Sequence, residues 1–158
     1  MNTLLHFLIG TWFINYTNFP MWTKGDKLNP TFTYTLIKKK EGSELLFDEV
    51  KYKKKTKIRT IKGFDHPDKQ DSSAFVWKGK GILSLLKSKW KVALKDEGGE
   101  WAVIYFSKTA FTPKGVDVIS RHCSLSETQL EKIKSMMLQD NLLKEYVSTL
   151  QLLNHKQE

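Results

Sequence analysis

Short apolar segments separated by turn-forming residues recur along the chain up to about residue 122, and this pattern limits the possible folds more than any other feature. Glycine, proline and aspartate gather between the segments, as in Lys40-Glu41-Gly42-Ser43 and His66-Pro67-Asp68, and such clusters form tight turns. Evenly spaced short segments of this kind favour an all-β sandwich or barrel. We therefore predict eight strands, at residues 11–19, 30–38, 44–53, 56–65, 73–78, 87–95, 100–108 and 116–122.

The predicted strands alternate in polarity, which places two sets of side chains on opposite faces. Phe32, Tyr34 and Leu36 share one face of their strand, and threonines occupy the other. Eight strands joined mainly by tight turns form an up-and-down meander, and closure of the meander removes its exposed edges. The predicted fold class is therefore all-β, an eight-stranded antiparallel up-and-down β-barrel.

The chain becomes helical in pattern after residue 124. Ser126 and Gln129 have the spacing of a capping box, which begins a helix. Two apolar runs with helical spacing follow, at 130–138 and 142–153. We predict a helix from about 126 to 137 and a second amphipathic helix after it, both packed outside the barrel. Residues 1–158 then form one domain, with the barrel at about 10–122 and the helices at about 126–153.

Composition and charge exclude several classes of protein. The single cysteine, Cys123, cannot form an intramolecular disulfide, which fits a reducing compartment. The net charge of +9 comes mostly from lysine, whereas specific recognition of nucleic acid prefers arginine. The densest basic run, 51–57, is either a solvated hairpin or a site of transient contact with an anionic membrane surface. No apolar run is long enough to span a membrane, and no leader is visible, so we expect a cytoplasmic protein.

Residues at both ends of the predicted barrel carry a family resemblance. Gly10-Thr11-Trp12 opens the first strand, and Val116-Asp117-Val118-Ile119-Ser120-Arg121 ends the last one directly before the capped helix. With these residues the chain resembles the lipocalins of the calycin superfamily, the bacterial lipocalins in particular. The resemblance implies a structural signature of Gly10, Trp12 and Arg121, in which the arginine stacks on the tryptophan at the closed end. The family's T-D-Y element is reduced here to Asp96-Glu97-Gly98-Gly99.

The resemblance also implies which side chains face the interior. If Trp12 and Arg121 point inward, the family pattern leaves Trp90, Val92 and Leu94 outside, beneath the C-terminal helices. Lys89 and Lys91 are then inside, where they either pair with a buried acid or hold the head group of an anionic ligand. The predicted ligand-binding residues are Tyr16, Phe32, Tyr34, Leu46, Asp48, Phe75, Trp77, Lys89, Lys91, Ile104, Phe106 and Asp117.

The function implied by the resemblance is that of a binding or carrier protein for a small hydrophobic or anionic amphiphilic ligand, such as a fatty acid or another lipid. The sequence contains no nucleophile motif, phosphate loop or metal-spaced histidine pair, and we expect no cofactor, no enzyme activity, and a monomer or weak dimer. One alternative is an isomerase-type enzyme that uses Asp117, Asp48 and Tyr34 in the cavity. Another is a carrier like the fatty-acid-binding proteins, although residues 23–30 leave no room for their helix pair.

Overall fold

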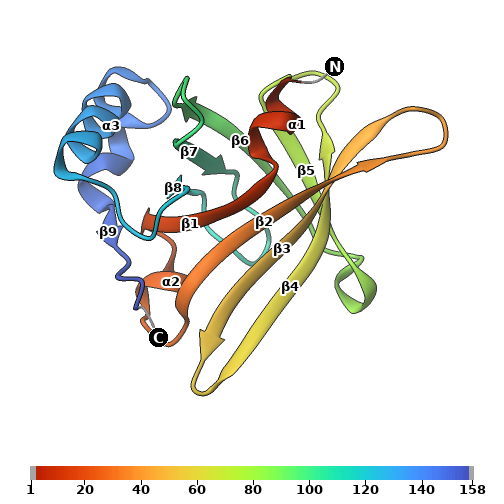
Figure 1. Ribbon diagram of the computed structural model, residues 1–158, viewed down its shortest axis with the longest axis horizontal. Coiled ribbons are helices and arrows are strands. Elements are labelled where there is room, and N and C mark those ends of the chain that lie inside the picture. Colours follow the sequence, from red (N-terminus) through yellow and green to blue (C-terminus); the bar gives the residue numbers. More distant parts are fainter. Residues whose placement is uncertain (1–2, 157–158) are drawn as a thin grey trace.

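Eight antiparallel strands close into a barrel in the computed structural model, which describes residues 3–156 (Figure 1). Each strand pairs with the next along the chain, and β1 pairs with both β2 and β8 to close the barrel. The predicted fold class and its eight strands are therefore confirmed. The strands are β1 (Gly10–Thr17), β2 (Leu28–Lys38), β3 (Glu44–Lys54), β4 (Lys57–Pro67), β5 (Ala74–Gly79), β6 (Lys87–Lys95), β7 (Trp101–Phe106) and β8 (Gly115–Ser120).

Two irregularities in the strand pairing decide which side chains face inward. The pairing of β1 with β8 shifts between Ile14 and Tyr16, so Asn15 is an extra residue in the strand. A second shift, between Val92 and Leu94, interrupts the pairing of β6 with β7. An extra residue turns the side chains that follow it to the other face of the sheet.

A short helix, α1 (Thr3–Leu8), covers the closed end of the barrel. Leu5 and Leu8 are fully buried in the inner core, and the Leu8 carbonyl accepts a hydrogen bond of 2.8 Å from the indole N–H of Trp12. The guanidinium carbon of Arg121 lies 3.5 Å from the centroid of the Trp12 ring, which is the stacking that the family resemblance implied. The sequence pattern did not predict α1, because its apolar residues precede the first turn signal.

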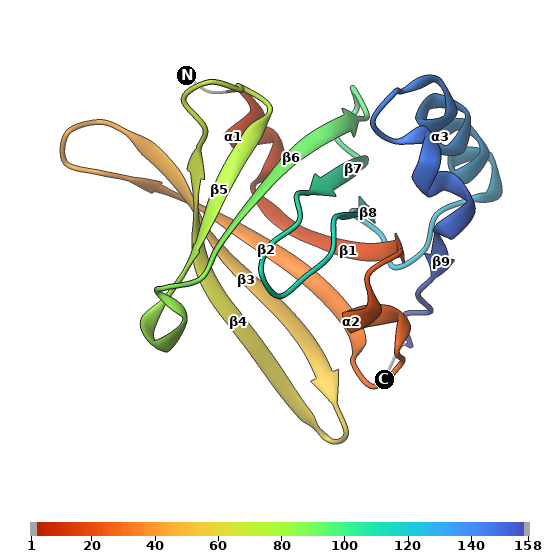
Figure 2. The same ribbon diagram turned by 180° about the vertical axis from the view of Figure 1, so that it is seen from behind.

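The C-terminal segment packs against the outer face of the barrel (Figure 2). α3 (Glu127–Gln139) begins with the predicted capping box of Ser126 and Gln129. Ile133 and Met137 of α3 pack with Leu143 and Tyr146 against the outer side chains of β7 and β8, including Trp101 and Val118. This second apolar cluster lies outside the barrel wall, as expected for helices packed on the barrel surface.

The predicted second helix is wrong beyond its first turns. Residues Lys144–Thr149 form the 3-10 helix η2, and Gln151–Leu152 form the short strand β9, which pairs with Tyr16 and Thr17 of β1. β9 satisfies backbone groups on the part of β1 that the irregularity at Asn15 leaves open, and Leu153 continues this by donating its N–H to the Asn15 carbonyl. Within residues 3–156, no helix has both the length and the apolar character to cross a membrane.

Candidate ligand-binding site

A large cavity opens at the end of the barrel opposite α1. In an up-and-down barrel, the connections β1–β2, β3–β4, β5–β6 and β7–β8 all lie at the same end, and three of them contribute to the cavity mouth. The β1–β2 connection holds the helix α2 (Pro20–Thr23), the β5–β6 connection holds the 3-10 helix η1 (Gly81–Leu83), and the β7–β8 connection is the loop at 107–114. The cavity volume is about 680 Å³, which lies within the range of small-molecule sites.

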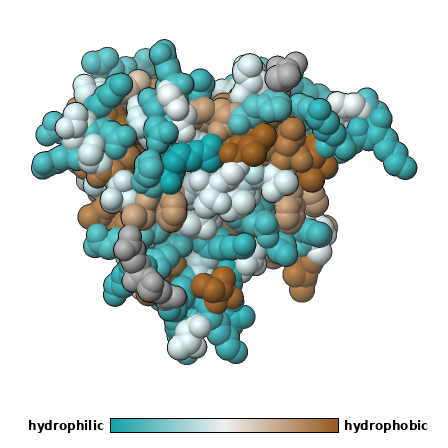
Figure 3. Space-filling view, viewed as in Figure 1, coloured by the Kyte–Doolittle hydropathy of each residue, from teal (hydrophilic) through white to brown (hydrophobic). Residues whose placement is uncertain are grey.

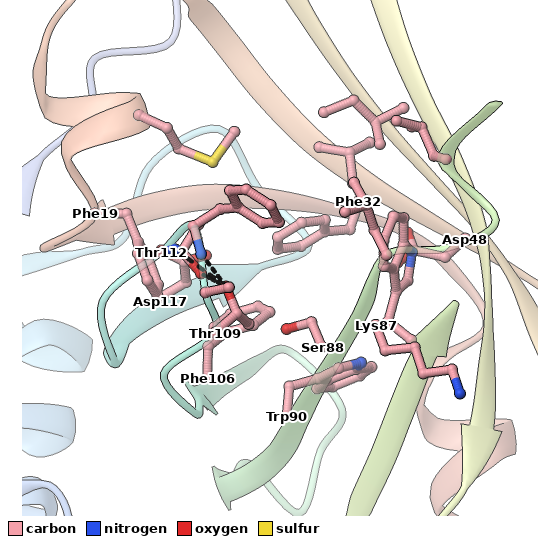
Figure 4. A pocket seen from close by; sticks show the side chains of 18 of the residues that line it. Phe19, Phe32, Asp48, Lys87, Ser88, Trp90, Phe106, Thr109, Thr112 and Asp117 are labelled. Atoms are coloured by element: carbon pink, nitrogen blue, oxygen red, sulfur yellow. Dashed lines mark hydrogen bonds between the residues drawn. The ribbon is translucent and has the colours of Figure 1, made fainter. Parts of the chain in front are cut away.

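Aromatic side chains form much of the cavity wall. Trp90 lies parallel to Tyr34, with ring centroids 5.9 Å apart, and to Phe106, with centroids 6.1 Å apart. The ring of Phe75 also stacks on Trp90, with centroids 4.8 Å apart. Figure 4 shows Phe32, Trp90 and Phe106 around the cavity. Stacked rings give the wall a fixed shape and an apolar surface with electron-rich faces.

Glycine on β4 makes room for one of these rings. A Cβ atom built on Gly63 would collide with the indole of Trp77, which therefore lies directly over the β4 backbone. Trp77 can lie against the barrel wall only because this inward-facing position of β4 carries no side chain. The wall is consequently flat at this point, and the space in front of Trp77 belongs to the cavity.

Two neighbouring carboxyl groups are buried deep in the barrel on β3 and β4. Asp48 lines the cavity and Asp65 lies behind it, and both are at least nine-tenths buried. The indole N–H of Trp90 donates a hydrogen bond of 2.7 Å to Oδ1 of Asp65. Burial raises the pKa of Asp65 to about 7, and burial together with repulsion from Asp65 raises the pKa of Asp48 well above its ordinary range. The contact between the two carboxyl groups raises the pKa of Asp48 and lowers that of Asp65, so a proton shared by the pair is favoured on Asp48.

A third buried acid, Asp117, lines the cavity on β8. It is almost fully buried, and the hydroxyl of Thr17 on β1 donates a hydrogen bond to it. Burial raises the pKa of Asp117 to about 7. Oδ1 of Asp117 and Oδ1 of Asp48 have no hydrogen-bond partner among the described residues. Because an unpartnered buried carboxyl oxygen is costly, these two atoms are candidate contact points for a ligand.

The structure brings half of the predicted ligand-binding residues to the cavity wall. These are Phe32, Tyr34, Asp48, Trp77, Phe106 and Asp117. Leu46, Phe75 and Ile104 also face inward, but they are fully packed in the inner core and do not line the cavity.

The predicted positions of Lys89 and Lys91 are wrong. Trp90 and Val92 are buried in the inner core, and the two lysines lie on the outer face, where Lys89 pairs with Asp68 and Lys91 with Asp71, each at 3.2 Å. The strand is turned the other way because burying an indole is favourable and burying two ammonium groups is not. The alternation Lys-Trp-Lys-Val is compatible with this orientation, and the pairing of Trp90 with the inward-facing Phe75 and Phe106 fixes it. Leu94 packs in the outer cluster, as predicted, because the irregularity after Val92 reverses the faces.

The predicted inward position of Tyr16 is also wrong. Tyr16 packs in the outer cluster near the C-terminal segment, whereas Thr17 next to it is buried and bonded to Asp117. The extra residue Asn15 causes this reversal, and the side chain of Asn15 donates a hydrogen bond to the His122 carbonyl. No local sequence pattern marks the irregularity.

Sequence reasoning also missed the residues of the cavity mouth. Phe19, Met21 and Trp22 come from the β1–β2 connection, and Trp22 stacks edge-on against Tyr52 at 5.7 Å. The other missed residues come from β6 and from the β5–β6 and β7–β8 connections, and include Leu83, Leu85, Leu86, Lys87, Ser88, Trp90, Thr109, Phe111 and Thr112.

Among residues 3–156, no three His, Cys, Asp or Glu side chains lie together so as to hold a metal ion.

The fold is similar to that of several solved structures. Lobster apocrustacyanin A1 superposes with a TM-score of 0.70 at 11% sequence identity, covering 96% of this chain and 79% of that one. The siderocalin Ex-FABP gives a TM-score of 0.67 at 13% identity and covers 96% of both chains. Per a 4, a major allergen of cockroaches, gives a TM-score of 0.67 at 13% identity, covering 96% of this chain and 88% of that one. By sequence, no family model and no curated protein matches. The barrel, its closed end and its C-terminal helix therefore have the lipocalin fold.

Proposed function

We propose that this protein binds a small, largely apolar molecule inside its barrel. The observation that carries the proposal is the cavity of about 680 Å³, which is lined by aromatic rings and holds two unpartnered carboxyl oxygens. Most ligand sites combine an apolar wall with a few convergent polar groups in this way. The siderocalin Ex-FABP, which has a similar fold, functions through dual ligand specificities, and this likeness also supports a binding role.

The polar groups of the cavity disfavour the anionic ligand that we expected from the sequence. Lys89 and Lys91 lie outside the barrel, and among residues 3–156 Lys87 at the mouth is the only basic residue that lines the cavity. A fatty-acid carboxylate inside would meet acids rather than lysines. We therefore propose a ligand without a negative charge.

Binding can be tested with the neutral dye N-phenylnaphthylamine, whose fluorescence rises in apolar surroundings. We expect saturable binding, and at least about a tenfold loss of affinity in Val50→Trp, because Val50 lines the cavity and a larger side chain would fill it. Val76→Trp is the matched control, since Val76 is on the outer face of β5 opposite Lys89. Native mass spectrometry of the purified protein should detect a small-molecule adduct. No dye binding, or equal loss in both folded variants, would contradict the proposal.

An acid–base enzyme is a second candidate function, favoured by one observation. Asp117 has a pKa of about 7 and shares the cavity with Tyr34, whose burial raises its own pKa well above its ordinary value and keeps it protonated. We propose binding without chemical conversion, because no histidine lines the cavity among the described residues. Incubation of the protein with acetonaphthone in deuterium oxide distinguishes a binding protein from an acid–base enzyme. Methyl-proton exchange that the protein accelerates, and that Asp117→Asn abolishes, would establish the enzyme.

We also propose that the rim of the open end contacts an anionic membrane surface. We define the rim as residues 18–27, 51–59, 80–87 and 107–114, which contain Asp26 as their only acid among many lysines. Large apolar side chains stand exposed on it: Ile82 is 99% exposed, Leu85 91% and Phe111 81%. Figure 3 shows apolar patches on this lower edge of an otherwise mostly hydrophilic face. Apolar side chains ringed by lysines suit insertion between anionic head groups, and the cavity mouth would then face the lipid.

Vesicle co-sedimentation tests this contact. We expect binding to vesicles of phosphatidylcholine with phosphatidylglycerol, little binding to phosphatidylcholine alone, and loss of binding in the double variant Leu85→Ser with Phe111→Ser. Leu138→Ser is the control, because Leu138 is an exposed leucine on α3 on the outer wall. Equal binding by the rim variant and the control would show that the exposed apolar residues do not dock.

A further inference from the structure

We propose that the cavity selects ligands that carry a protonated amine, with Asp117 as the counter-ion and the aromatic wall around the cationic group. This inference rests on the proposed binding function and names the chemical class of its ligand. It starts from three groups on different strands, which are Asp117 on β8, Asp48 on β3 and the rings that line the space between them. Figure 4 shows the two acids on opposite sides of the cavity, with Phe32 and Phe106 between them.

Asp117 is built to receive a donor. Its carboxylate receives one hydrogen bond from Thr17, and the hydroxyl of Thr17 is itself fixed because it accepts the backbone N–H of Phe19 at 3.0 Å. The remaining oxygen, Oδ1, has no partner, although the side chain is 1% exposed. A ligand ammonium at this atom would form a charge-assisted hydrogen bond in a site largely shielded from water, where such bonds are strong.

The charges around Asp117 favour a cation over every other ligand class. The ionisable groups in the interior near it are Tyr34 on β2, which interacts with Asp117 directly, Asp48 across the cavity on β3, and Asp65 behind Asp48 on β4, and the charges of all of these are negative or zero. Lys87 is the only basic residue of the cavity, and it is at the mouth on β6. Within the part of the chain that the structure describes, no buried base therefore neutralises Asp117.

The aromatic wall adds a second interaction that also attracts a cation. Trp90 stacks on Tyr34 at an interplanar angle of 20° and on Phe106 at 28°, and all three rings line the cavity. An ammonium within about 6 Å of a ring face is attracted to it, and the attraction grows when water is excluded. Carboxylate and rings together form a site that distinguishes an amine from an alcohol of the same shape.

Isothermal titration calorimetry with three matched probes, naphthylethylamine, naphthylethanol and naphthylacetate, tests the inference. At pH 8 we expect the amine to bind about tenfold more tightly than the alcohol, since only the amine gives Asp117 a hydrogen bond in which both partners are charged, and the acid to bind most weakly. Asp117→Asn should abolish the advantage of the amine and leave the affinity of the alcohol unchanged. Glu49→Gln is the matched control, because it also removes one carboxylate, but from the outer face of β3, where Glu49 pairs with Lys62.

The pH dependence gives an independent readout. Because Asp117 has a pKa of about 7, the affinity of the amine should rise between pH 5 and pH 8 in the wild type, while the amine itself remains protonated, and most of this rise should be lost in Asp117→Asn. Equal affinities for amine and alcohol, with both bound, would overturn the amine selectivity and leave the proposed function standing. Failure of all three probes to bind, together with the dye, would overturn both.

Discussion

Arg121→Met tests the contact that closes the end of the barrel. The Arg121 guanidinium stacks at 3.5 Å on Trp12, which is fully buried, and donates hydrogen bonds to the carbonyls of Phe7, Ile9 and Thr11 at 2.9, 3.0 and 3.2 Å. The stacking is worth about 1–2 kcal/mol when shielded. Water can replace the guanidinium at the exposed carbonyls of Ile9 and Thr11, so only the half-buried bond to Phe7 adds about 1 kcal/mol. Methionine still covers the indole and leaves no cavity, so these two contributions give an expected loss of about 2–3 kcal/mol in the free energy of unfolding.

Urea unfolding followed by circular dichroism measures this loss directly. In a thermal scan it corresponds to a fall in Tm of roughly 4–12 °C for a chain of this size. Arg121→Lys should show an intermediate loss, because an ammonium keeps the charge but lacks the planar fork that reaches several carbonyls. Arg59→Met is the matched control, since Arg59 is exposed on β4. If Arg121→Met and Arg59→Met unfold at the same urea concentration, the closed end is held by apolar packing alone and the reasoning is refuted.

Three further predictions concern the interior and the outer wall. Lys89→Met and Lys91→Met should leave ligand affinity unchanged, because their ion pairs with Asp68 and Asp71 lie on the outer face; a clear loss in a dye titration would place them in the site. Stability should fall as pH rises from about 4 to about 7, because the folded state holds protons on Asp65 and Asp117 that the unfolded chain releases near its ordinary pKa; Asp117→Asn should flatten part of this slope in urea unfolding at several pH values. Trp90→Phe should cost about 1–3 kcal/mol in the same assay, because Oδ1 of Asp65 loses its indole donor, and an unchanged midpoint would mean that the bond contributes nothing.

The buried acids also bear on how the protein balances stability and binding. Asp48, Asp65 and Asp117 are polar groups inside an apolar barrel, where aliphatic residues of similar size would be easier to bury. Asp48 and Asp117 line the cavity, and each has one buried oxygen without a partner among the described residues. A ligand donor at these atoms would stabilise the folded state, so the melting temperature should rise with ligand concentration.

The sequence by itself determined the eight strands of the barrel and the first C-terminal helix. Period-two alternation and turn residues defined the eight strands, the capping box of Ser126 and Gln129 defined the start of α3, and the closing pair of Trp12 and Arg121 followed from the family resemblance. These features are local, or are anchored at strand ends, so each can be recognised within a few neighbouring residues.

Only the tertiary structure decided which faces line the cavity and which residues meet there. The extra residue Asn15 turned Tyr16 outward, and the pairing of Trp90 with Phe75 and Phe106 turned Lys89 and Lys91 to the surface. A shift of one residue reverses every side chain of a strand, and register depends on the partner strand rather than on the strand's own sequence. The pairing of β3 with β4 brought Asp65 beside Asp48, although sequence reasoning had not singled out Asp65. The character of the site, acidic rather than basic inside, therefore arose from strand register, which is a property of the closed barrel.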